Sequence, residues 1–459
     1  MCMKSPIIEK FSILGLHSDR DVHLKFDSPY KILVADNGAG KTTILNALFY
    51  CLTGKIDKLS KIEFNKIILK IKGKPEVTIN NKDVNAAVRG YIDHPFFKKL
   101  SDKIGINTAL ELLDIAEDTN SLSAVRNHPS FLKYMRKASS SELEVLRMID
   151  YISKKKGVAF ELKQETLFES DFLSKKKLAS CDFDLDVYYL PTYRRVEEDL
   201  VRLGYNANDF SDNNQLIHFG MTDVDKRFKL ITENIKDSAV RWYSRISGRM
   251  LDELMNGISF DNDQLDKIKQ PKTLRILLDR IGDSISVSRK DEILELVDSE
   301  KIYEDKYRAL AYFLLNLVDI YDQQREKDSQ IKKFVSVANK YLVGKELEYN
   351  ESEVTIKVIN NRNKKRKEVK LDKLSSGEKQ LISILSKLYL EAEKPVAIIF
   401  DEPELSLSID WQKSILPDLI ASEKCGMLLA ATHSPFIFDN NLDAYAEALK
   451  IEYKDVCND

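Results

Sequence analysis

The segment A-D-N-G-A-G-K-T-T at Ala35–Thr43 decides the fold of this chain. A short apolar stretch at Lys31–Val34 precedes it, and apolar residues at helical spacing follow over Thr43–Leu52. A glycine-rich turn between a strand and a helix points backbone N–H groups, and the positive end of the helix, toward phosphate. The sequence therefore predicts a phosphate-binding loop at residues 35–43.

We expect this loop to bind the phosphates of ATP. Lys41 should reach the β- and γ-phosphates, and Thr42 should place its hydroxyl on Mg²⁺. The loop departs from the usual pattern at Ala35, where glycine is expected. A positive φ at that position would cost alanine about 1 kcal/mol. The residues predicted to contact the nucleotide here are Asn37, Gly38, Ala39, Gly40, Lys41, Thr42 and Thr43.

A second segment, I-I-F-D-E-P-E at Ile398–Glu404, supplies the carboxylates of the predicted site. Asp401 ends an apolar run, which is typical of a buried parallel strand that delivers a carboxylate to the edge of a sheet. We expect Asp401 to hold Mg²⁺ together with Thr42. Glu402 is then placed to orient or deprotonate the attacking water.

His433 lies 32 residues beyond Asp401, at the end of the predicted strand Met427–Ala431. The carboxyl ends of strands in an open parallel sheet border the ligand crevice. A lone histidine is more often structural, but in this setting we expect His433 to contact the γ-phosphate and to register its presence. Glu402 and His433 are therefore the predicted catalytic residues.

The segment L-S-S-G-E-K-Q at Leu374–Gln380 opens a predicted helix with serine hydroxyls and a glycine amide, again an anion-binding arrangement. We expect Ser375, Ser376, Gly377 and Glu378 to meet the γ-phosphate of an ATP bound on an opposing protomer. We expect Ser406–Ser408 to lie along the same interface between the two protomers. The predicted partner is thus a second copy of the chain, joined through composite ATP sites.

The composition of the chain sets the class of protein. Its 459 residues are 43% hydrophobic and 31% charged with a formal net charge of −2, so no overall field attracts nucleic acid or an anionic membrane. No apolar run approaches the ~20 residues that span a bilayer, and no secretory signal is visible. The five cysteines lack metal-ligand spacing. We expect reduced thiols in a cytoplasmic protein with no membrane contact.

The predicted fold class is α/β: an ABC-type (P-loop) ATPase head split into two lobes, with a mainly helical insertion between them. The N-terminal lobe is residues 1–85 and the C-terminal lobe is residues 343–459. The insertion, residues 86–342, includes a short strand and P-T-Y-R-R near 187–195. It lacks sustained heptads, which favours a compact lid or short arm over a long coiled coil.

The three motifs, in this order, resemble those of ABC-type ATPases of the group that holds SMC proteins, double-strand-break repair ATPases and OLD nucleases. A closer resemblance rests on D-E-P-E-L-S-L-S-I-D-W-Q at 401–412, T-H-S-P-F-I-F-D-N at 432–440 and Y-Y-L-P-T-Y-R-R at 188–195. These segments are similar to the ATPase subunits (AriA) of PARIS bacterial phage-defence systems. Many relatives carry histidine at the position of Ser408, so that part of the resemblance is to a subset.

This resemblance implies more than ATP turnover. It implies a homo-oligomer, a hexamer made of dimers, that holds a TOPRIM-type nuclease subunit inactive. A phage-encoded trigger protein, such as a DNA-mimicking anti-restriction factor, would release or activate the nuclease, which in this family attacks host tRNA. The chain itself is expected to have no nuclease centre, since only 26 residues follow His433.

Two alternatives stay open on the sequence. A Septu-type ATPase would work with an HNH nuclease instead, and an SMC-like repair ATPase would bind DNA directly. The hairpin tip Arg362–Lys367 could touch DNA phosphates, but a solvated tip is the favoured interpretation. Arg20 is considered as a contact to the adenine base of ATP. Arg194 and Arg195 are assigned neither to an interface nor to the site.

Overall fold

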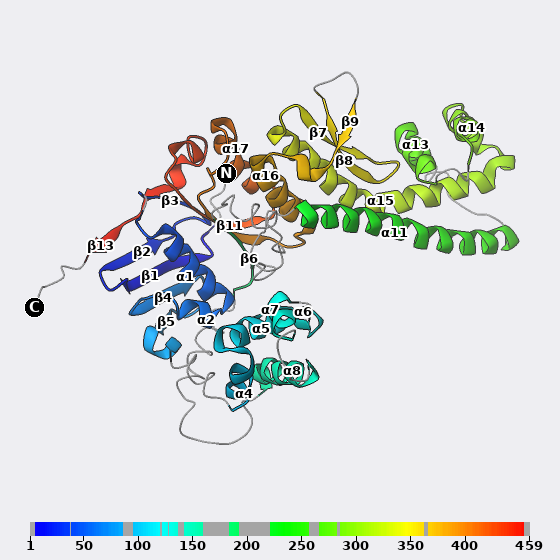
Figure 1. Ribbon diagram of the computed structural model, residues 1–459. Helices are drawn as coiled ribbons and strands as arrows, with labels where there is room; N and C mark the ends of the chain where they lie inside the picture. The colour runs from blue at the N-terminus through cyan, green and yellow to red at the C-terminus, as the bar shows by residue number, and fades with distance from the viewer. Residues whose placement is uncertain are drawn as a thin grey trace, which may run out of the picture. The chain divides into compact units, whose positions relative to one another are not determined.

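The structure is a computed structural model with a mixed α/β fold (Figure 1). It describes residues 5–36, 38–85, 95–119, 122–126, 128–135, 142–158, 183–191, 221–256, 266–281, 285–361 and 366–453. The chain forms two compact units, one from Met1–His218 with Glu393–Asp459 and the other from Phe219–Ala392. The predicted division at residues 85 and 342 stays a prediction.

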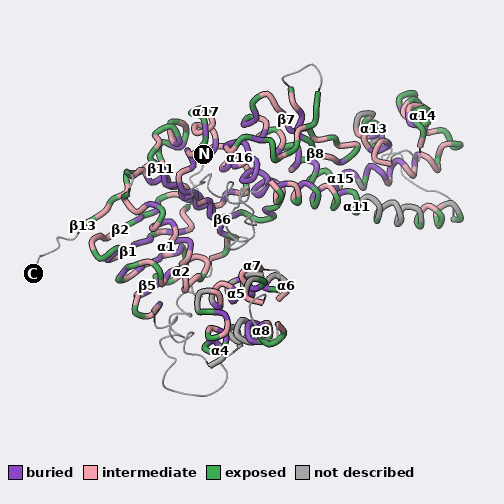
Figure 2. Tube along the Cα trace, in the orientation of Figure 1, coloured by how far each residue is buried: buried purple, intermediate pink, exposed green. Residues whose placement is uncertain are grey.

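A parallel five-stranded sheet forms the centre of the first unit. Its strand order is β12-β3-β11-β10-β6, and every neighbouring pair is parallel. All six residues of β10 are buried, as expected for the apolar run V-A-I-I-F-D, and so are seven of the eight residues of the neighbouring β11 (Figure 2). The strands predicted at 31–34, 187–190, 396–400 and 427–431 are confirmed. The bounds are β3 Tyr30–Val34, β6 Asp186–Leu190, β10 Val396–Asp401, β11 Cys425–Thr432 and β12 Ala446–Ala448.

An antiparallel sheet of order β13-β2-β1-β4-β5 is the second layer of this unit. In β4 each second residue is buried, which gives one apolar face and one half-exposed face. The strand β1, the longest among the described residues, is not among the strands that the sequence patterns predicted. The bounds are β1 Ile8–Leu16, β2 Arg20–Lys25, β4 Lys66–Ile71, β5 Val77–Asn80 and β13 Ile451–Tyr453.

The helix α1 (Lys41–Thr53) joins the two sheets in one core. Its buried Leu45, Leu48 and Phe49 share a hydrophobic cluster with Phe11 of β1 and Ile399 of β10. The helix ends at Gly54, whose φ of 69° provides the left-handed C-cap. Helix α1 therefore holds the phosphate-loop end of β3 against the apolar faces of both sheets.

Five described helices between residues 95 and 158 have a core of their own, which contains Phe97, Leu112, Phe131 and Ile149. They are α4 Pro95–Ile104, α5 Ile106–Thr119, α6 Leu122–Arg126, α7 Pro129–Met135 and α8 Glu142–Val158. Two more helices of the first unit are α2 Ile56–Leu59 and α17 Ile409–Ala421. None of the described helices is long and apolar enough to cross a membrane.

The second unit contains two long helices, α11 (Met221–Asn256) and α15 (Arg308–Ala338), which pack against each other. With 36 residues, α11 is about 54 Å long. The smaller helices α13 (Pro271–Arg280) and α14 (Val287–Asp298) pack near one end of α15 (Figure 1).

A three-stranded antiparallel sheet, β7-β8-β9, precedes helix α16 (Ser376–Ser386). We call α16 the signature helix, because the segment L-S-S-G-E-K-Q opens it. The strand β7 (Lys345–Asn350) was not predicted, whereas β8 (Thr355–Asn360) confirms the first strand of the predicted hairpin. The second strand of the hairpin, β9 (Lys367–Val369), ends shortly before residues 371–373, which form a 3₁₀ turn that leads into the helix N-cap. Residues 362–365 of the basic tip, and Tyr193, Arg194 and Arg195, lie outside the described residues.

A buried ion pair joins three elements of the second unit. Arg280, at the end of α13, donates two hydrogen bonds to the carboxylate of Asp328 in α15, at 2.8 and 3.0 Å. Tyr349 of β7 donates its hydroxyl to the same carboxylate. The side chains of Arg280 and Asp328 are 4% and 2% exposed. The charges are thus balanced within the apolar interior, which buried charges require.

Candidate functional site

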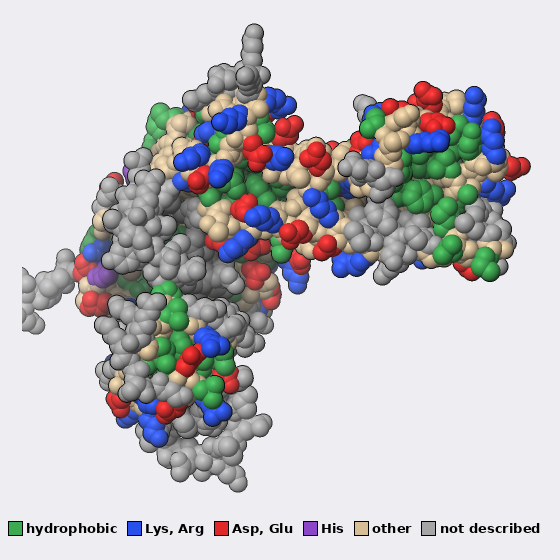
Figure 3. All heavy atoms as spheres, turned by 45° about the vertical axis from the view of Figure 1, so that its right-hand side comes forward, with side chains coloured by type: hydrophobic (Ala, Val, Ile, Leu, Met, Phe, Trp, Pro, Cys, Tyr) green, Lys and Arg blue, Asp and Glu red, His purple; other side chains and the backbone are tan. Residues whose placement is uncertain are grey.

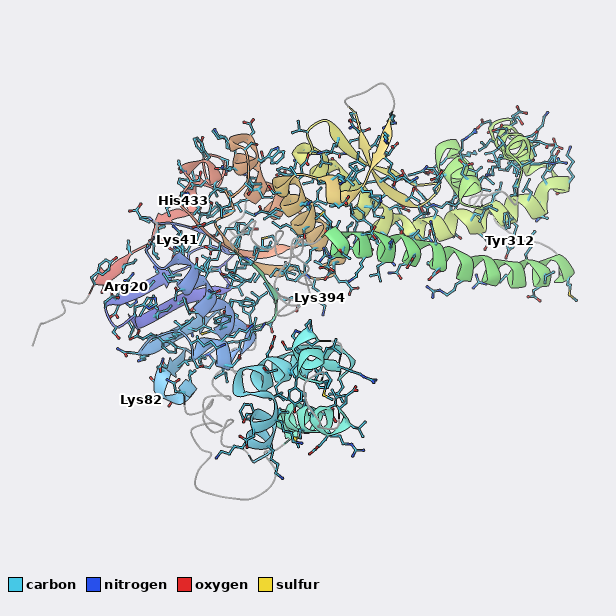
Figure 4. All side chains as sticks on the ribbon, viewed as in Figure 1. Arg20, Lys41, Lys82, Tyr312, Lys394 and His433 are labelled. Atoms are coloured by element: carbon cyan, nitrogen blue, oxygen red, sulfur yellow. The ribbon has the colours of Figure 1, made fainter. Side chains whose placement is uncertain are left out.

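The predicted motifs of the first unit leave the same edge of the parallel sheet. Asp401 of β10 is opposite Ala431 of β11, and Thr432 is opposite Val34 of β3. The Ala35 N–H donates to the carbonyl of Thr432 at 3.2 Å, so the phosphate loop begins beside the residue that precedes His433. Figure 4 shows Lys41 and His433 at this end of the sheet. The fold therefore brings together three segments that are far apart in sequence.

The phosphate loop has the backbone that its glycines permit. Gly38 and Gly40 both have φ of 83°, in the left-handed region, and Gly40 is the N-cap of α1. Ala35 is not among the residues with positive φ. The strain considered for alanine at this position is therefore absent. Asn37 lies outside the described residues.

The Lys41 ammonium is folded over its own loop. Its Nζ donates to the carbonyls of Ala35 at 2.8 Å and Asp36 at 3.1 Å, and the residue is only 6% exposed. A lysine ammonium has three donors, so one remains for a further acceptor in this geometry. The side chain is thus held at the mouth of the loop, next to the N-terminus of α1.

Thr42 and Asp401 meet across the two motifs. The Thr42 hydroxyl donates to Oδ2 of Asp401 at 2.6 Å, and Asp401 is fully buried. A hydroxyl and a carboxylate are hard oxygen ligands of the kind that Mg²⁺ prefers, and Mg²⁺ takes its remaining ligands from phosphate and water. The donor set therefore fits the metal predicted from the sequence.

Glu402 has an unusual backbone conformation. Its φ is 50°, which is uncommon for a non-glycine residue, and its N–H donates to the carbonyl of Ala431 at 2.9 Å. Such conformations cost of order 1–3 kcal/mol and are concentrated at functional sites. The side chain is half-buried at the edge of the sheet, directly after the predicted metal ligand.

One residue of this site was missed in the sequence: Glu404, the second glutamate of D-E-P-E. Its Oε1 accepts the backbone N–H of His433 at 3.0 Å and lies 2.8 Å from Nδ1 of the imidazole. Its Oε2 accepts the Thr432 hydroxyl at 2.8 Å. Glu404 is 6% exposed, whereas the His433 side chain is 44% exposed. The second glutamate of D-E-P-E, two residues after Glu402, was the sequence feature that could have identified Glu404.

A buried tyrosine lies on the neighbouring strand. Tyr189 of β6 is opposite Ile399 of β10, and its ring stacks on Phe49 of α1 with centroids 5.1 Å apart. Burial, together with the negative charge of Asp401, raises the pKa of the Tyr189 hydroxyl far above its ordinary value. Tyr189 therefore stays neutral and packs in the hydrophobic cluster that β6 shares with α1.

The signature segment lies in the second unit, at the start of α16. Ser375 is the N-cap, and it forms a capping box with Glu378. Both Glu378 oxygens also accept hydrogen bonds from Nζ of Lys345, at 2.9 and 2.7 Å. Burial alone would raise the pKa of Glu378, but the hydrogen bonds from Lys345 and Ser375 outweigh burial and hold this pKa below its ordinary value. Glu378 is thus a structural anion of the helix start.

Ser376 and Gly377 occupy the first two positions of α16. Within the described part of the chain, no hydrogen bond of the Ser376 hydroxyl is found. Sequence reasoning missed Lys345, which begins a strand that was not predicted and lies 33 residues from Glu378. Arg20, the guessed base contact, pairs with Asp19 at 2.7 Å and lies over the ring of Tyr453.

Comparison with known families gives a match over residues 223–439. The matched family is described as "AAA domain, putative AbiEii toxin, Type IV TA system". The match covers slightly less than half of the chain. It includes the signature helix, Asp401 and His433, and it does not include the phosphate loop.

Among curated proteins, the chain is 24% identical over 246 residues to "DNA replication and repair protein RecF" of Clostridium kluyveri. The alignment covers 50% of this chain and 64% of that relative. The chain thus spans less than two thirds of the length of the curated relative that it matches.

Two solved structures have low overall similarity to the chain. One is the Smc head domain of Pyrococcus furiosus with an extended coiled coil, bound to the C-terminal domain of ScpA (TM-score 0.38, 13% identity, 98% of this chain and 96% of that chain). The other is a SmcHead bound to the C-winged helix domain of ScpA (TM-score 0.37, 12% identity, 98% of each chain). These scores are too low to assign an activity.

Proposed function

We propose that the chain binds and hydrolyses ATP with Mg²⁺. The observation that carries this proposal is the meeting of Thr42 and Asp401 at 2.6 Å, at the sheet edge from which Lys41 and His433 also project. A bound Mg²⁺ would neutralise the negative charge that develops on the leaving phosphate oxygen. The match to an AAA-domain family and the likeness to RecF support the same activity class.

In this proposal the residues divide the work. The N–H groups of residues 38–43 and the Lys41 ammonium bind phosphate oxygens, while Thr42 and Asp401 hold the metal. Glu402 orients or deprotonates the attacking water, and His433 contacts the γ-phosphate.

The test is ATP binding by calorimetry, and release of phosphate, for the wild-type chain and Lys41→Ala. We expect the variant to lose ATP binding by at least about tenfold, because the phosphates lose their principal cation. Lys82→Ala is the matched control, since Lys82 is exposed and lies well away from Lys41 in Figure 4. Unchanged ATP affinity in Lys41→Ala would remove the site assignment.

We also propose that the active assembly is a homodimer, or a larger oligomer made from dimers, with Ser376 and Gly377 of one copy at the γ-phosphate of the other. In support, α16 begins with backbone N–H groups and with the Ser376 hydroxyl, while Glu378 is neutralised by Lys345. The helix start can therefore face a phosphate without repulsion. Light scattering with and without ATP in the Glu402→Gln variant tests the assembly.

The finer proposal is a switch that controls a toxic partner. The segments at 188–195, 401–412 and 432–440 support a phage-defence ATPase of the PARIS type, which holds a TOPRIM-type nuclease inactive until a phage protein is sensed. The toxin–antitoxin description of the matched family favours the same class. Co-expression with the product of the adjacent gene, with and without phage infection, tests it. A TOPRIM product whose toxicity depends on Lys41 is expected, and an HNH product would favour a Septu-type system.

The RecF likeness favours a second candidate, an ATPase that acts on DNA. This function needs a positive surface for phosphates, whereas the face shown in Figure 3 mixes basic and acidic side chains. Binding of a DNA duplex by the purified protein, measured against salt, separates the two candidates. Affinity that falls steeply with salt would favour the DNA function.

A further inference from the structure

The strand end at His433 contains a buried carboxylate that accepts two hydrogen bonds and lies close to the imidazole ring. The donors to Glu404 are the Thr432 hydroxyl and the His433 backbone N–H, and the ring nitrogen Nδ1 of His433 lies 2.8 Å from Oε1. Thr432 is fully buried, and its oxygen also accepts the N–H of Ser434 at 2.9 Å. The backbone and side-chain donors of Thr432 and His433 thus fix the position of the Glu404 carboxylate.

The chemistry of this contact determines which ring nitrogen carries the proton. An ionised carboxylate only accepts hydrogen bonds. At 2.8 Å from Oε1, Nδ1 has to be the donor, because two lone pairs at that distance would repel each other. In a neutral imidazole the other nitrogen, Nε2, then keeps its lone pair.

We propose that Glu404 is a positioning residue that holds His433 in the Nδ1–H form and leaves Nε2 for the attacking water at the nucleotide. This inference rests on the proposed ATPase. The neutral ring accepts a hydrogen bond at Nε2 from the attacking water. Donation from Nε2 to a γ-phosphate oxygen requires the doubly protonated ring, whose charge Glu404 balances. The orienting role of a buried carboxylate on a catalytic imidazole follows the same logic as in hydrolytic triads.

The nitrogen spectrum of the ring tests the tautomer without any turnover. The chain has six histidines, so selective ¹⁵N labelling gives few signals, and His433→Gln assigns the relevant one. We expect the wild-type ring to carry its proton on Nδ1. In Glu404→Ala the signal should move toward the Nε2–H form, and Glu404→Gln, which keeps an accepting oxygen, should restore the Nδ1–H form in part.

A matched control perturbs the same carboxylate and leaves the imidazole contact intact. Thr432→Val removes one donor to Glu404 without touching Nδ1. It should leave the His433 signal at the wild-type position even where it lowers stability. A purely structural role for Glu404 predicts the same spectrum in every variant that folds.

Steady-state kinetics then connect the tautomer to the reaction. We expect Glu404→Ala to lower kcat by at least about tenfold, which is less than the roughly 10²–10⁴-fold contribution of an acid–base group itself, with KM for ATP within about twofold. A wild-type ring protonated only on Nε2, or a His433 signal unaffected by Glu404→Ala, would overturn the inference. A tautomer change in a chain that shows no ATPase activity would instead overturn the proposed function and keep the role of Glu404.

Discussion

Glu402 combines an uncommon backbone conformation with a predicted role in hydrolysis. Its φ of 50° is maintained by the surrounding structure, including the hydrogen bond from its N–H to Ala431. This geometry sets the carboxylate directly after Asp401, at the sheet edge that borders the phosphate loop. A side chain in such a position is expected to affect the reaction more than the fold.

We predict that Glu402→Gln keeps ATP binding and slows hydrolysis by roughly 10²–10⁴-fold, the usual contribution of a general base. Glutamine has nearly the same shape but cannot take the proton. ATP binding is measured by calorimetry and turnover by phosphate release. Wild-type turnover in this variant would show that another group activates the water.

At the signature helix, the pair of Lys345 and Glu378 predicts a pH-dependent stability. Because the folded-state pKa of Glu378 is held below its ordinary value of 4.5, the ionised pair stabilises the fold above that value. This stabilisation is lost as the pH falls through the lowered pKa. Lys345→Ala should therefore lower the free energy of unfolding by about 1–3 kcal/mol at pH 7. The difference from wild type should shrink in denaturant titrations toward pH 3, and a difference independent of pH would contradict the assignment.

Among the elements, the hairpin of β1 and β2 depends on Gly15. Its φ is 68°, and an added Cβ would lie 2.3 Å from Nδ2 of Asn65. The register of β1 shifts between Ile13 and Leu16, which identifies a bulge at this glycine.

We predict that Gly15→Ala lowers the free energy of unfolding by more than the about 1 kcal/mol of left-handed strain alone. Gly73→Ala is the matched control, because Gly73 has φ of 74° and an added Cβ would meet nothing within 4 Å. Urea denaturation of the two variants separates the steric clash from the backbone strain. Equal losses would mean that Asn65 moves aside freely.

The interhelical ion pair of Arg280 and Asp328 gives a second prediction at this scale. Arg280→Ala leaves a buried carboxylate without its cation, so we expect a loss of about 3–5 kcal/mol in the free energy of unfolding. Arg289→Ala is the control, since Arg289 pairs with Glu292 at an exposed site, where a pair contributes about 1 kcal/mol at most. A small loss in Arg280→Ala would mean that water reaches the pair.

Comparison of the elements with the sequence shows what local patterns determine. Apolar runs such as Val396–Phe400, and the glycine pattern before Lys41, identified the parallel strands and the phosphate loop, because these features depend on neighbouring residues. The strands β1 and β7 were missed. Lys345 was missed together with β7, because its ion-pair partner Glu378 lies in another element. The role of Glu404 depends on where β11 places His433, which no spacing along the chain defines.

For the whole molecule, the proposed composite site can be tested by mixing two inactive variants. Lys41→Ala removes the phosphate lysine, and Ser376→Arg blocks the start of α16. In a mixed dimer, one site carries both defects and the other carries neither. We predict that each variant alone is inactive and that an equal mixture regains about one quarter of wild-type turnover, as expected for a symmetric dimer. Hydrolysis within a single copy would instead leave Ser376→Arg active by itself, and the mixture would show only the activity of its Ser376→Arg copies.

The division of the chain into units also has a consequence for its synthesis on the ribosome. The parallel sheet needs β3 and β6 from the early part of the chain, and β10 and β11 from the late part. Between Leu190 and Cys425, 235 positions have to be translated, which takes roughly 10–50 s at typical elongation rates. The unit at Phe219–Ala392 is continuous and emerges whole during that interval. The nascent chain therefore completes its continuous unit before the nucleotide-binding sheet can close, and the unpaired β3 and β6 are the segments that a chaperone would need to protect.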